Sequence, residues 1–552
     1  MAQDLARRCG AADEAFFREA MASPAAAETE RESRRRLSYG TAGFRREGST
    51  LIGVAFRCGM LAAVRSIALQ GRATGLVVTA SHNPVEDNGV KLVDGDGGML
   101  HMSWEKHAEA IVSAQNAVDL EQVVLRILAK EEVNLMGGER AGTVLLALDT
   151  RPTGPRLVSA AMAGIRAAGA AVVGSEDTLR TTPQLHWQVL ATNAGGPCEE
   201  KDYYDKLNRA CSSLLLGRDA AVSSLVVDCA NGVGALKLPS VLPAVTASGT
   251  AVTLANTGGG TLNSLCGADF VQKERRLPMC VGALAGGQLG ASFDGDADRI
   301  VFFVGGSESG GSDLDLLDGD KILCLLAGHL KRCVEGLGGS FGPVAFGCIQ
   351  TAYANGSSTR YLEQGLGLEV VKTKTGVKHL HAAALAFDLS VYFEANGHGT
   401  VLFSPDFLRR LREAKGSGSE WAGHLLEISN VVNPAIGDAL SVLLLVLAIL
   451  SHEAGGLDTW RGLYADAPSR MLKCVVPDRS AIKTTNAEQR MTQPAALQAK
   501  VDDLVAGAEL ARAFVRPSGT EDVVRIYAEA RTQEQADQLA TSIERDVAAF
   551  FS

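Results

Sequence analysis

Three aspartates alternate in the stretch FDGDADRI, and their spacing indicates a metal site. In an extended loop, Asp294, Asp296 and Asp298 direct their carboxylates to the same side. Three carboxylate oxygens suit Mg²⁺, which keeps its other positions for water or phosphate oxygens. An EF-hand loop is excluded by its own pattern, because its sixth position is Arg299 rather than Gly and its twelfth is Gly305 rather than Glu. Apolar runs on both sides of the stretch disfavour a solvated acidic turn.

Ser81 follows a short apolar run, LVV, in the sequence LVVTASHNP. One interpretation is a turn residue, since Asn-Pro is ordinary turn chemistry, and the other is a nucleophile. The G-x-S-x-G pattern of serine hydrolases is absent, because Ala80 and His82 flank the serine. The chain also lacks a Walker A lysine motif and a G-x-G-x-x-G that opens a helix. A serine that accepts phosphate needs a cation and a clamp for the rest of the substrate.

The sequence VRPSGTEDVVR is a candidate for that clamp. Two guanidinium groups, two hydroxyls and free backbone N–H groups at a glycine can hold a phosphate dianion. The residues concerned are Arg516, Ser518, Gly519, Thr520 and Arg525. A turn with surface arginines is the alternative interpretation of this stretch.

Two further loops carry candidate polar groups. FEANGHGT places Glu394, Asn396 and His398 at alternate positions after a strand-like run, and such groups suit sugar hydroxyls. His398 could move a proton because the ordinary pKa of histidine lies near neutral pH, although a strand-end turn with a hydrogen-bonded histidine explains the pattern equally. SYGTAGFRRE supplies Arg45 beside a glycine-containing turn, which is a weak signal by itself.

Strands that end in polar loops recur along the chain. Examples are VLLALDTRPTG, LVVDCANGVG and LGASFDGDADR, with Ala- and Leu-rich helical segments between them. Continuous apolar strands alternating with helices predict α/β layers with mixed or mostly parallel sheets, whose ligands bind at the carboxyl ends of strands. A chain of 552 residues is too long for one core. We expect four domains, at residues 1–185, 186–303, 304–430 and 431–552.

Charge and composition restrict the partners and the compartment. A net charge of −10 argues against nucleic-acid binding. The longest apolar run, Ala439 to Leu450, is too short to cross a bilayer and predicts a buried helix. Eleven cysteines without CxxC pairs indicate reduced thiols, and the first twenty residues lack the apolar core of a signal peptide. We therefore expect a cytoplasmic protein with no membrane partner.

Taken together, the loops resemble the α-D-phosphohexomutase superfamily. TASHNP, DGDADR and RPSGTE occur in that family's order, and the resemblance spans roughly residues 38 to 530. CANGVGALKL, LNSLCGAD, QTAYANGSSTRYLE, TKTGVKHLH and FEANGHGT are similar to its acetylglucosamine branch. The departures are small: Leu148 stands where a glycine-arginine lead-in is expected, and the stretch 94–100 is looser than the family form.

The resemblance implies a fold and an activity. The fold would have three α/β domains with mixed sheets and a C-terminal α+β phosphate-binding domain around a central cleft. The enzyme would interconvert N-acetylglucosamine 6-phosphate and N-acetylglucosamine 1-phosphate through a sugar 1,6-bisphosphate, which also serves as activator, and would feed UDP-N-acetylglucosamine synthesis. Ser81 would carry the phosphoryl group, and Mg²⁺ would bind to its phosphate and to the three aspartates.

The resemblance also assigns roles to the remaining loops. Glu394 and Asn396 would contact the sugar, with Lys378 and His379 of TKTGVKHLH beside them, and the clamp from Arg516 to Arg525 would hold the phosphate that is not reacting. Proton transfer or charge neutralisation is left to four unranked residues, Arg45, His82, Lys91 and His398. Alternatives are a phosphogluco- or phosphomannomutase, dual specificity, a catalytically silent sugar-phosphate sensor and a serine hydrolase. We expect a monomer or weak homodimer.

Overall fold

The computed structural model describes residues 1–20, 24–35, 37–41, 43–133, 142–284, 288–306, 314–518 and 523–551. The chain divides into two compact units. Unit 1 comprises Met1–Leu316 and Asn430–Leu445, and unit 2 comprises Leu317–Ser429 and Val446–Ser552.

The first sheet of unit 1 has the strand order β1-β3-β2-β4-β5. Its strands are β1 (Phe44–Glu47), β2 (Thr74–Val78), β3 (Asp87–Val93), β4 (Thr143–Leu148) and β5 (Ala171–Val173). The sheet is mixed, because β2, β4 and β5 are parallel while β3 runs antiparallel to β1 and β2. The helices of this part are α1 (Ala2–Ala20), α2 (Pro24–Arg35), α3 (Ile52–Ala68), α4 (Met102–Ser113), α5 (Ala117–Lys130) and α6 (Gly154–Ala167).

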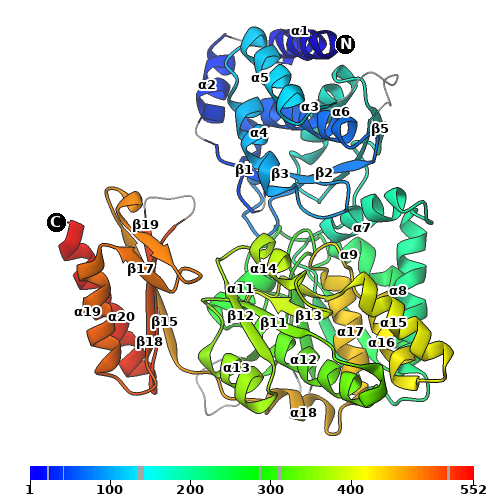
Figure 1. The fold of residues 1–552 in the computed structure, drawn as a ribbon, viewed down its shortest axis with the longest axis vertical. Helices are drawn as coiled ribbons and strands as arrows, with labels where there is room; N and C mark the ends of the chain where they lie inside the picture. The colour runs from blue at the N-terminus through cyan, green and yellow to red at the C-terminus, as the bar shows by residue number, and fades with distance from the viewer. Residues whose placement is uncertain are drawn as a thin grey trace. The chain divides into compact units, whose positions relative to one another are not determined.

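Helices cover both faces of this sheet, which explains why β2 is buried along its whole length. Leu76 and Val78 belong to the core that β2 shares with α3 and α6. Val77, which points to the opposite face, packs with Leu185 and Val189 of α7 (Thr182–Asn193). Figure 1 shows α3 to α6 on one side of the strands and α7 on the other. A strand buried on both faces has no polar alternation, as the sequence indicated.

The second sheet of unit 1 has the order β10-β9-β8-β6-β7 and holds the aspartate loop. Its strands are β6 (Ser224–Asp228), β7 (Ala251–Ala255), β8 (Leu289–Phe293), β9 (Ile300–Gly305) and β10 (Leu314–Leu317). The strands β7, β6 and β8 are parallel, and β9 runs antiparallel to β8. Its helices are α8 (Glu200–Leu215), α9 (Gly234–Lys237), α10 (Pro243–Ala247) and α11 (Ala268–Glu274). FDGDADRI forms the connection between β8 and β9.

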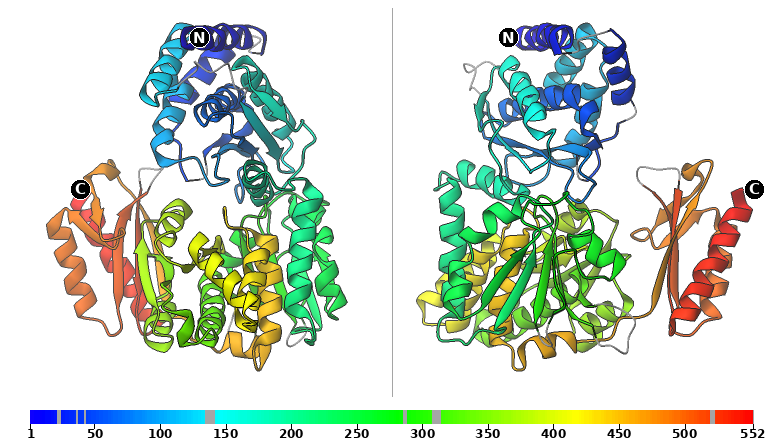
Figure 2. Two further views of the ribbon diagram at one scale, coloured as in Figure 1. Left: turned by 45° about the vertical axis from the view of Figure 1, so that its right-hand side comes forward. Right: turned by 180° about the vertical axis from the view of Figure 1, so that it is seen from behind.

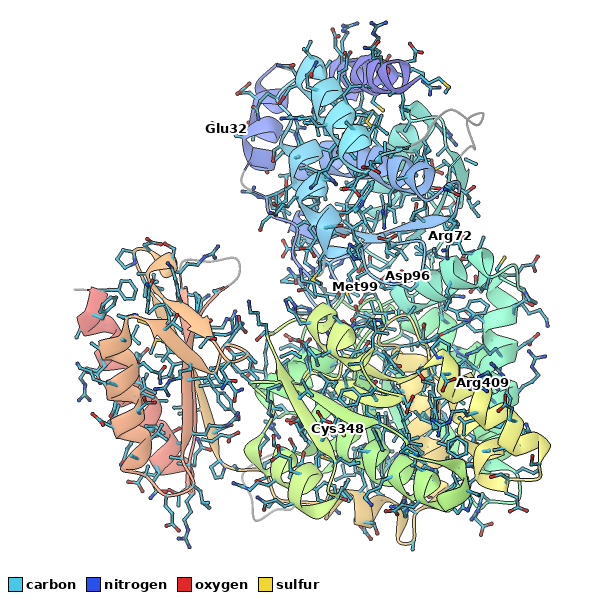
Figure 3. The ribbon with its side chains drawn as sticks, in the orientation of Figure 1. Glu32, Arg72, Asp96, Met99, Cys348 and Arg409 are labelled. Atoms are coloured by element: carbon cyan, nitrogen blue, oxygen red, sulfur yellow. The ribbon has the colours of Figure 1, made fainter. Side chains whose placement is uncertain are left out.

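Unit 2 begins with a four-stranded mixed sheet of order β12-β11-β13-β14. The strands are β11 (Phe346–Thr351), β12 (Glu369–Thr373), β13 (Leu389–Phe393) and β14 (Gly399–Phe403), and only β14 is antiparallel to its neighbour. The helices are α12 (Gly319–Gly336), α13 (Gly356–Arg360), α14 (Val377–Ala384), α15 (Pro405–Gly416), α16 (Glu420–Val431) and α18 (Gly456–Arg461). Cys348 of β11 is fully buried in this layer (Figure 3).

The predicted buried helix is present as α17 (Ala439–His452), whose apolar residues are nearly all inaccessible. Within the described ranges, no helix is long and apolar enough to cross a membrane.

The last part of unit 2 is an α+β layer. Strands β15 (Ser469–Val475), β18 (Arg512–Pro517) and β19 (Val523–Glu529) form an antiparallel sheet of order β15-β19-β18, and β16 (Lys483–Thr485) pairs with β17 (Arg490–Gln493). Helices α19 (Ala495–Ala506) and α20 (Gln533–Phe551) lie on one face of the three-stranded sheet (Figures 1 and 2). The predicted combination of α/β layers with mixed sheets and a C-terminal α+β layer is confirmed.

Two glycines allow α3 and α6 to pack with their backbones in contact. A Cβ atom at Gly164 would lie 1.9 Å from the carbonyl oxygen of Phe56, and one at Gly59 would lie 2.2 Å from that of Ala161. Both distances are far below a van der Waals contact, so the helices could not keep this separation with alanine at either position. This pair of helices covers the sheet that carries Ser81.

We predict that Gly164→Ala destabilises the protein by about 1–3 kcal/mol, because a methyl group must force the two helices apart. Thermal or urea unfolding of the purified variant measures the change. Gly416→Ala is the matched control: Gly416 ends α15, and no atom lies within 4 Å of the place that its Cβ would occupy, so the same substitution there is neutral or slightly stabilising. Equal destabilisation by the two substitutions would contradict the packing argument.

Candidate active site

Ser81 lies in the loop that follows β2, in a conformation that side chains rarely adopt. Its φ is +48° and it is fully buried. A non-glycine residue in this left-handed region costs on the order of 1 kcal/mol or more, so surrounding contacts must hold it there. One such contact is its own backbone N–H, which donates to Thr79 Oγ1 at 2.9 Å.

Arg151 fixes the Ser81 loop through its backbone carbonyls. Its guanidinium donates to the carbonyl oxygens of Ser81 at 3.0 Å, Asn83 at 2.8 Å and Asp87 at 2.7 Å, and also to that of Pro84. The side chain is 1% exposed. Because β4 lies parallel and adjacent to β2, the residues that follow the two strands meet at the same edge of the sheet.

Asp149 orients both Arg151 and Thr79. Its Oδ2 accepts from Arg151 Nε at 3.1 Å and from Thr79 Oγ1 at 2.7 Å. Burial raises the pKa of Asp149 to about 6, although the neighbouring Arg151 charge opposes this shift. The chain of contacts from Asp149 through Thr79 to the Ser81 N–H positions the serine without touching its hydroxyl.

Two residues from connections of the second sheet of unit 1 also contact the Ser81 loop. Asn263 Nδ2 donates to the carbonyl oxygens of Ser81 at 2.8 Å and Asn83 at 3.0 Å. Gly295, inside the aspartate loop, approaches so closely that a Cβ there would lie 2.6 Å from the Ser81 carbonyl oxygen. The glycine between the first two aspartates is therefore a steric requirement for bringing the two loops together.

The three aspartates form a compact, buried group. Asp294 and Asp296 are 0% exposed and Asp298 is 4% exposed, and ligand oxygens from all three lie within 4.8 Å of one another. Asp294 Oδ1 accepts from the backbone N–H groups of Asp298 at 3.1 Å and Arg299 at 3.2 Å, which shapes the loop. Burial and the neighbouring Asp298 and Asp296 raise the pKa of Asp294 well above its usual range.

This arrangement fits a hard divalent cation. Asp294 Oδ2 and Asp296 Oδ1 are buried and have no hydrogen-bond partner in the part of the chain that the structure describes. Buried carboxylate oxygens without partners are costly unless an ion binds to them. An all-oxygen donor set suits Mg²⁺ rather than a thiophilic metal. The residues present therefore fit the predicted cation.

The Ser81 hydroxyl lies among charged groups. Lys91 Nζ donates to Ser81 Oγ at 2.8 Å and Arg45 Nη2 donates to it at 3.1 Å, while Oγ itself lies 3.1 Å from Asp296 Oδ2. Lys91 Nζ also contacts Asp296 at 2.7 Å and Asp298 at 2.9 Å. Two cations beside Oγ can stabilise negative charge on that oxygen or on a group attached to it.

The pKa values of these two cations reflect burial and their partners. Burial acts to lower the pKa of Lys91, but the attraction of Asp296 and Asp298 is stronger in sum, so this pKa is raised. Burial lowers the pKa of Arg45 to about 10, with the nearby Arg299 charge acting in the same direction.

Thr182 is a further residue at the site. It opens α7, and its Oγ1 donates to Asp296 Oδ2 at 2.6 Å while its backbone N–H donates to the Asp296 carbonyl oxygen at 3.2 Å. The amino-terminal end of a helix favours a nearby negative charge. The side chain of Thr182 and the start of α7 therefore help to hold the Asp296 carboxylate in place.

His82 occupies a different environment from Ser81. It lines a cavity of about 430 Å³ together with Pro84, Asn263 and Lys273, among others. Burial, followed by the charges of Arg299 and Arg45, lowers the pKa of His82, so the imidazole is neutral. Its Nδ1 has no hydrogen-bond partner among the described residues.

Unit 2 holds the predicted sugar loop between β13 and β14. The loop is closed by Glu394 N donating to the His398 carbonyl oxygen at 2.9 Å and by His398 N donating to Asn396 Oδ1 at 3.0 Å. Glu394 Oε1 accepts from the backbone N–H of Gly376, which precedes α14, at 3.1 Å. Lys378 and His379 lie in the first turn of that helix, so the structure brings the predicted loop residues and these two helix residues to neighbouring elements.

The predicted phosphate clamp is on β18 and β19, where Arg516 pairs with Arg525. Arg516 Nε donates to Tyr353 Oη at 2.9 Å and Nη1 donates to Glu488 Oε1 at 3.3 Å. Glu488 Oε2 accepts from Thr375 N at 3.0 Å, which connects the clamp strand with the segment before α14. Ser518 is buried. Gly519 and Thr520 lie outside the described residues.

The sequence predictions thus fall into two groups, and five residues at the site were missed. Unit 1 contains Ser81, Arg45, His82, Lys91 and the three aspartates; unit 2 contains His398, the sugar-loop residues and the clamp. The missed residues are Thr79, Asp149, Arg151, Thr182 and Asn263. Four of them lie within motifs recognised in the sequence, TASHNP, DTRPTG and LNSLCGAD, but nothing in a residue type indicates a contact with a carbonyl oxygen of a distant loop.

Comparisons with protein families match most of the chain. Residues 194–301 and 318–454 match phosphoacetylglucosamine mutase AMG1 domains II and III. Residues 50–119 and 114–197 match the phosphoglucomutase/phosphomannomutase alpha/beta/alpha domain I, and residues 471–545 match the C-terminal domain of the same family. The boundaries that we predicted near residues 185, 303 and 430 stay predictions.

Individual proteins show the same similarity. A phosphoacetylglucosamine mutase from Oryza sativa subsp. japonica is 46% identical, with 93% of this chain and 94% of that protein aligned. The crystal structure of Aspergillus fumigatus N-acetylphosphoglucosamine mutase with GlcNAc-6P and magnesium gives a TM-score of 0.86 at 38% identity, covering 96% of this chain and 100% of that one. A related structure of that enzyme, with glucose 1,6-bisphosphate, gives 0.85 at 38% identity and the same coverage. This chain therefore belongs to the phosphoacetylglucosamine mutases of the α-D-phosphohexomutase superfamily.

Proposed function

We propose that this protein interconverts N-acetylglucosamine 6-phosphate and N-acetylglucosamine 1-phosphate by passing a phosphoryl group through Ser81. The observation that carries the proposal is the position of Ser81 Oγ, in contact with Lys91, Arg45 and Asp296 beside three buried carboxylates. A sensor without activity would not need this combination of nucleophile, cations and metal ligands. The family relationship and the GlcNAc-6P bound to the Aspergillus enzyme support the same substrate.

In the first step the sugar O1 attacks the phosphorus of phosphorylated Ser81, and the bond between phosphorus and Oγ breaks. Oγ leaves with negative charge, which Lys91 and Arg45 stabilise from 2.8 and 3.1 Å. Asp294, Asp296 and Asp298 would hold Mg²⁺, which would add positive charge beside the transferring group. The product is the 1,6-bisphosphate, and the proton of the O1 hydroxyl passes to a base.

In the second step the bisphosphate presents its 6-phosphate to Ser81. Oγ attacks that phosphorus, the bond between phosphorus and O6 breaks, O6 takes up a proton, and N-acetylglucosamine 1-phosphate leaves while Ser81 is phosphorylated again. The site must therefore accept the sugar in two orientations. Alternating donors and acceptors on Glu394 and Asn396 suit a ring whose hydroxyls exchange places, with Lys378 and His379 on the adjacent helix. The clamp formed by Arg516, Ser518, Gly519, Thr520 and Arg525 would hold whichever phosphate is not reacting.

Four residues are candidates for proton transfer in this scheme. Lys91 and Arg45 contact Ser81 Oγ directly, which suits charge neutralisation. His82 is a neutral imidazole with an unbonded Nδ1 among the described residues, so it can accept a hydrogen bond, but its lowered pKa makes it a weak base. His398 belongs to the sugar loop, where it could serve a hydroxyl of the substrate. The pH dependence of kcat, measured after substitution of each of these four residues in turn, would rank them.

Loss of the Ser81 phosphate would stop turnover, and a sugar 1,6-bisphosphate would restore it by donating one phosphoryl group. The glucose 1,6-bisphosphate complex of the Aspergillus enzyme supports this choice of activator.

Five expectations from the sequence stay predictions. They are a cytoplasmic location, a monomer or weak homodimer, the absence of nucleic-acid partners, the absence of membrane partners, and a role in supplying UDP-N-acetylglucosamine synthesis.

The first prediction from this proposal concerns Ser81→Ala. With Mg²⁺ and catalytic bisphosphate, wild type should convert N-acetylglucosamine 1-phosphate, and the variant should lose on the order of 10³-fold or more in kcat, because no oxygen remains to carry the phosphoryl group. A coupled assay for the 6-phosphate measures both. Ser212→Ala, on the exposed face of α8, is the control with full activity.

The same assay separates the alternatives. A wild type that turns over glucose 1-phosphate faster than the acetylated sugar would place the chain among gluco- or mannomutases. Turnover of neither sugar would return the sensor interpretation, and activity retained by Ser81→Ala would exclude the phosphoserine route.

Activity should also depend on Mg²⁺ bound by the three aspartates. Removal of divalent ions with EDTA abolishes turnover, and added Mg²⁺ restores it. In Asp298→Asn, which keeps the side-chain shape but removes a charge, half-maximal activity requires at least about 10-fold more Mg²⁺. Asp205→Asn makes the same change in an exposed i,i+4 ion pair and leaves the Mg²⁺ titration unaltered. Equal titration curves for the two variants would refute this metal assignment.

Arg151→Lys tests whether positioning of the Ser81 loop matters for catalysis. A lysine cannot reach all four carbonyl oxygens at once, so Ser81 Oγ loses its fixed position. We expect kcat to fall about 10- to 100-fold with little change in KM, because Arg151 contacts the loop rather than the sugar.

The control for this effect is Arg156→Lys on the exposed surface of α6, which should be neutral. An increase in KM at unchanged kcat for Arg151→Lys would show instead that Arg151 acts in substrate binding.

A further inference from the structure

A second group of potential metal ligands lies in unit 2, apart from the three aspartates of unit 1. His329 and Cys333 are one turn apart on α12 and therefore share a face of the helix, and His424 comes from α16. One ligand atom of each lies within 4.8 Å of the others. His329 is 4% exposed and Cys333 is fully buried. We call these three residues the His–Cys cluster.

The hydrogen bonds of His329 leave one ring nitrogen directed at His424. His329 Nδ1 lies 3.0 Å from Glu453 Oε1, and its Nε2 lies 2.9 Å from His424 Nε2. A carboxylate accepts the proton of Nδ1, which assigns the lone pair to Nε2. Histidines that bind metals usually donate their other N–H to a carboxylate in this way. Glu453 is itself paired with Arg332, so it is held in place.

Two imidazole nitrogens 2.9 Å apart can share a proton, and such a hydrogen bond accounts for the pair of histidines alone. It does not account for the third ligand, the Cys333 sulfur, in the same small space. Two nitrogens and a sulfur are the donor set of zinc sites, and they are unsuited to Mg²⁺. The ring of His452, whose centroid lies 4.7 Å from that of His424, adds a further imidazole beside the cluster.

We propose that the His–Cys cluster binds Zn²⁺ through His329, Cys333 and His424. A water molecule or His452 completes four-coordination. On binding, the Cys333 thiol loses its proton to solvent and the sulfur forms a bond to the metal. Burial raises the pKa of this thiol to about 12, so the metal has to displace the proton. The ion would tie α16 to α12, and its ligands include none of the residues that contact Ser81.

Cobalt(II) distinguishes this site from the aspartate site, because only a thiolate ligand gives a sulfur-to-cobalt charge-transfer band. We would strip the full-length protein with a chelator, add Co²⁺, and record the absorption spectrum, then displace the ion with Zn²⁺. The expected result is one equivalent with a charge-transfer band that Zn²⁺ abolishes and excess Mg²⁺ does not. Absence of this band in wild type would overturn the proposal.

Substitutions in the His–Cys cluster test whether the charge-transfer band arises there. Cys333→Ser and His424→Gln should lower the affinity on the order of 100-fold or more. Cys280→Ser removes an exposed cysteine and should leave both the band and the affinity unchanged. A band that persists in Cys333→Ser, or disappears in Cys280→Ser, would refute the assignment.

A wild-type measurement covers the case in which the cluster variants fail to fold. Zn²⁺ should raise the Tm of wild type by several degrees in the presence of saturating Mg²⁺, because an ion that binds only the folded state stabilises it. A Tm that does not change with Zn²⁺ would contradict binding at this site.

Discussion

Ser81 Oγ lies within about 3 Å of two cations and a carboxylate, in a place that water does not reach, and the rest of unit 1 is arranged around that contact. At an effective dielectric constant of about 20, two unit charges 4 Å apart interact by about 4 kcal/mol. Desolvating each ion costs several kcal/mol. The desolvation cost offsets the attraction, so a buried charged group of this kind is weak evidence for stability. What it provides is a fixed position for the hydroxyl beside two cations, where we propose that phosphate is transferred.

The need to hold those charges in place explains features of the structure that cost free energy by themselves. Ser81 adopts a left-handed φ, which Arg151 and Asn263 maintain by binding the carbonyl oxygens of its loop. Gly295 permits the aspartate loop to approach, and the start of α7 with Thr182 holds Asp296. Apart from Asn263, which lies in the connection between β7 and α11, these residues follow the end of a strand or begin a helix. A rigid sheet buried on both faces thus positions a loop that local propensity alone would not stabilise.

Much of the fold and of the candidate site was predictable, because the residue types in each motif indicate the chemistry they can perform. Alternating aspartates between apolar strands indicated a metal site, and the layered α/β fold followed from apolar runs that alternate with helices. Ser81 and Asp296 are 215 residues apart in sequence, yet their contact was implied once one was assigned to phosphate and the other to the cation. The roles of individual side chains remain proposals, but their clustering follows from the pattern.

Other contacts left no signal that sequence reasoning could use. Arg151 binds four backbone carbonyls, and any arginine near a strand end could do so. Thr182 meets Asp296 only because α7 packs under the first sheet. In the His–Cys cluster, the i,i+4 spacing of His329 and Cys333 is visible in sequence, whereas their approach to His424 depends on how α16 packs. Contacts set by tertiary packing between distant elements require the structure.

The most direct measurement of the central claim is to follow the phosphoryl group itself. Dephosphorylated protein would be incubated with ³²P-labelled glucose 1,6-bisphosphate, digested and mapped, and a second sample chased with unlabelled N-acetylglucosamine 6-phosphate. The account predicts that only the peptide containing Ser81 carries label, and that this label moves to the sugar during the chase. Label on another residue, or label on Ser81 that the sugar cannot remove, would contradict it.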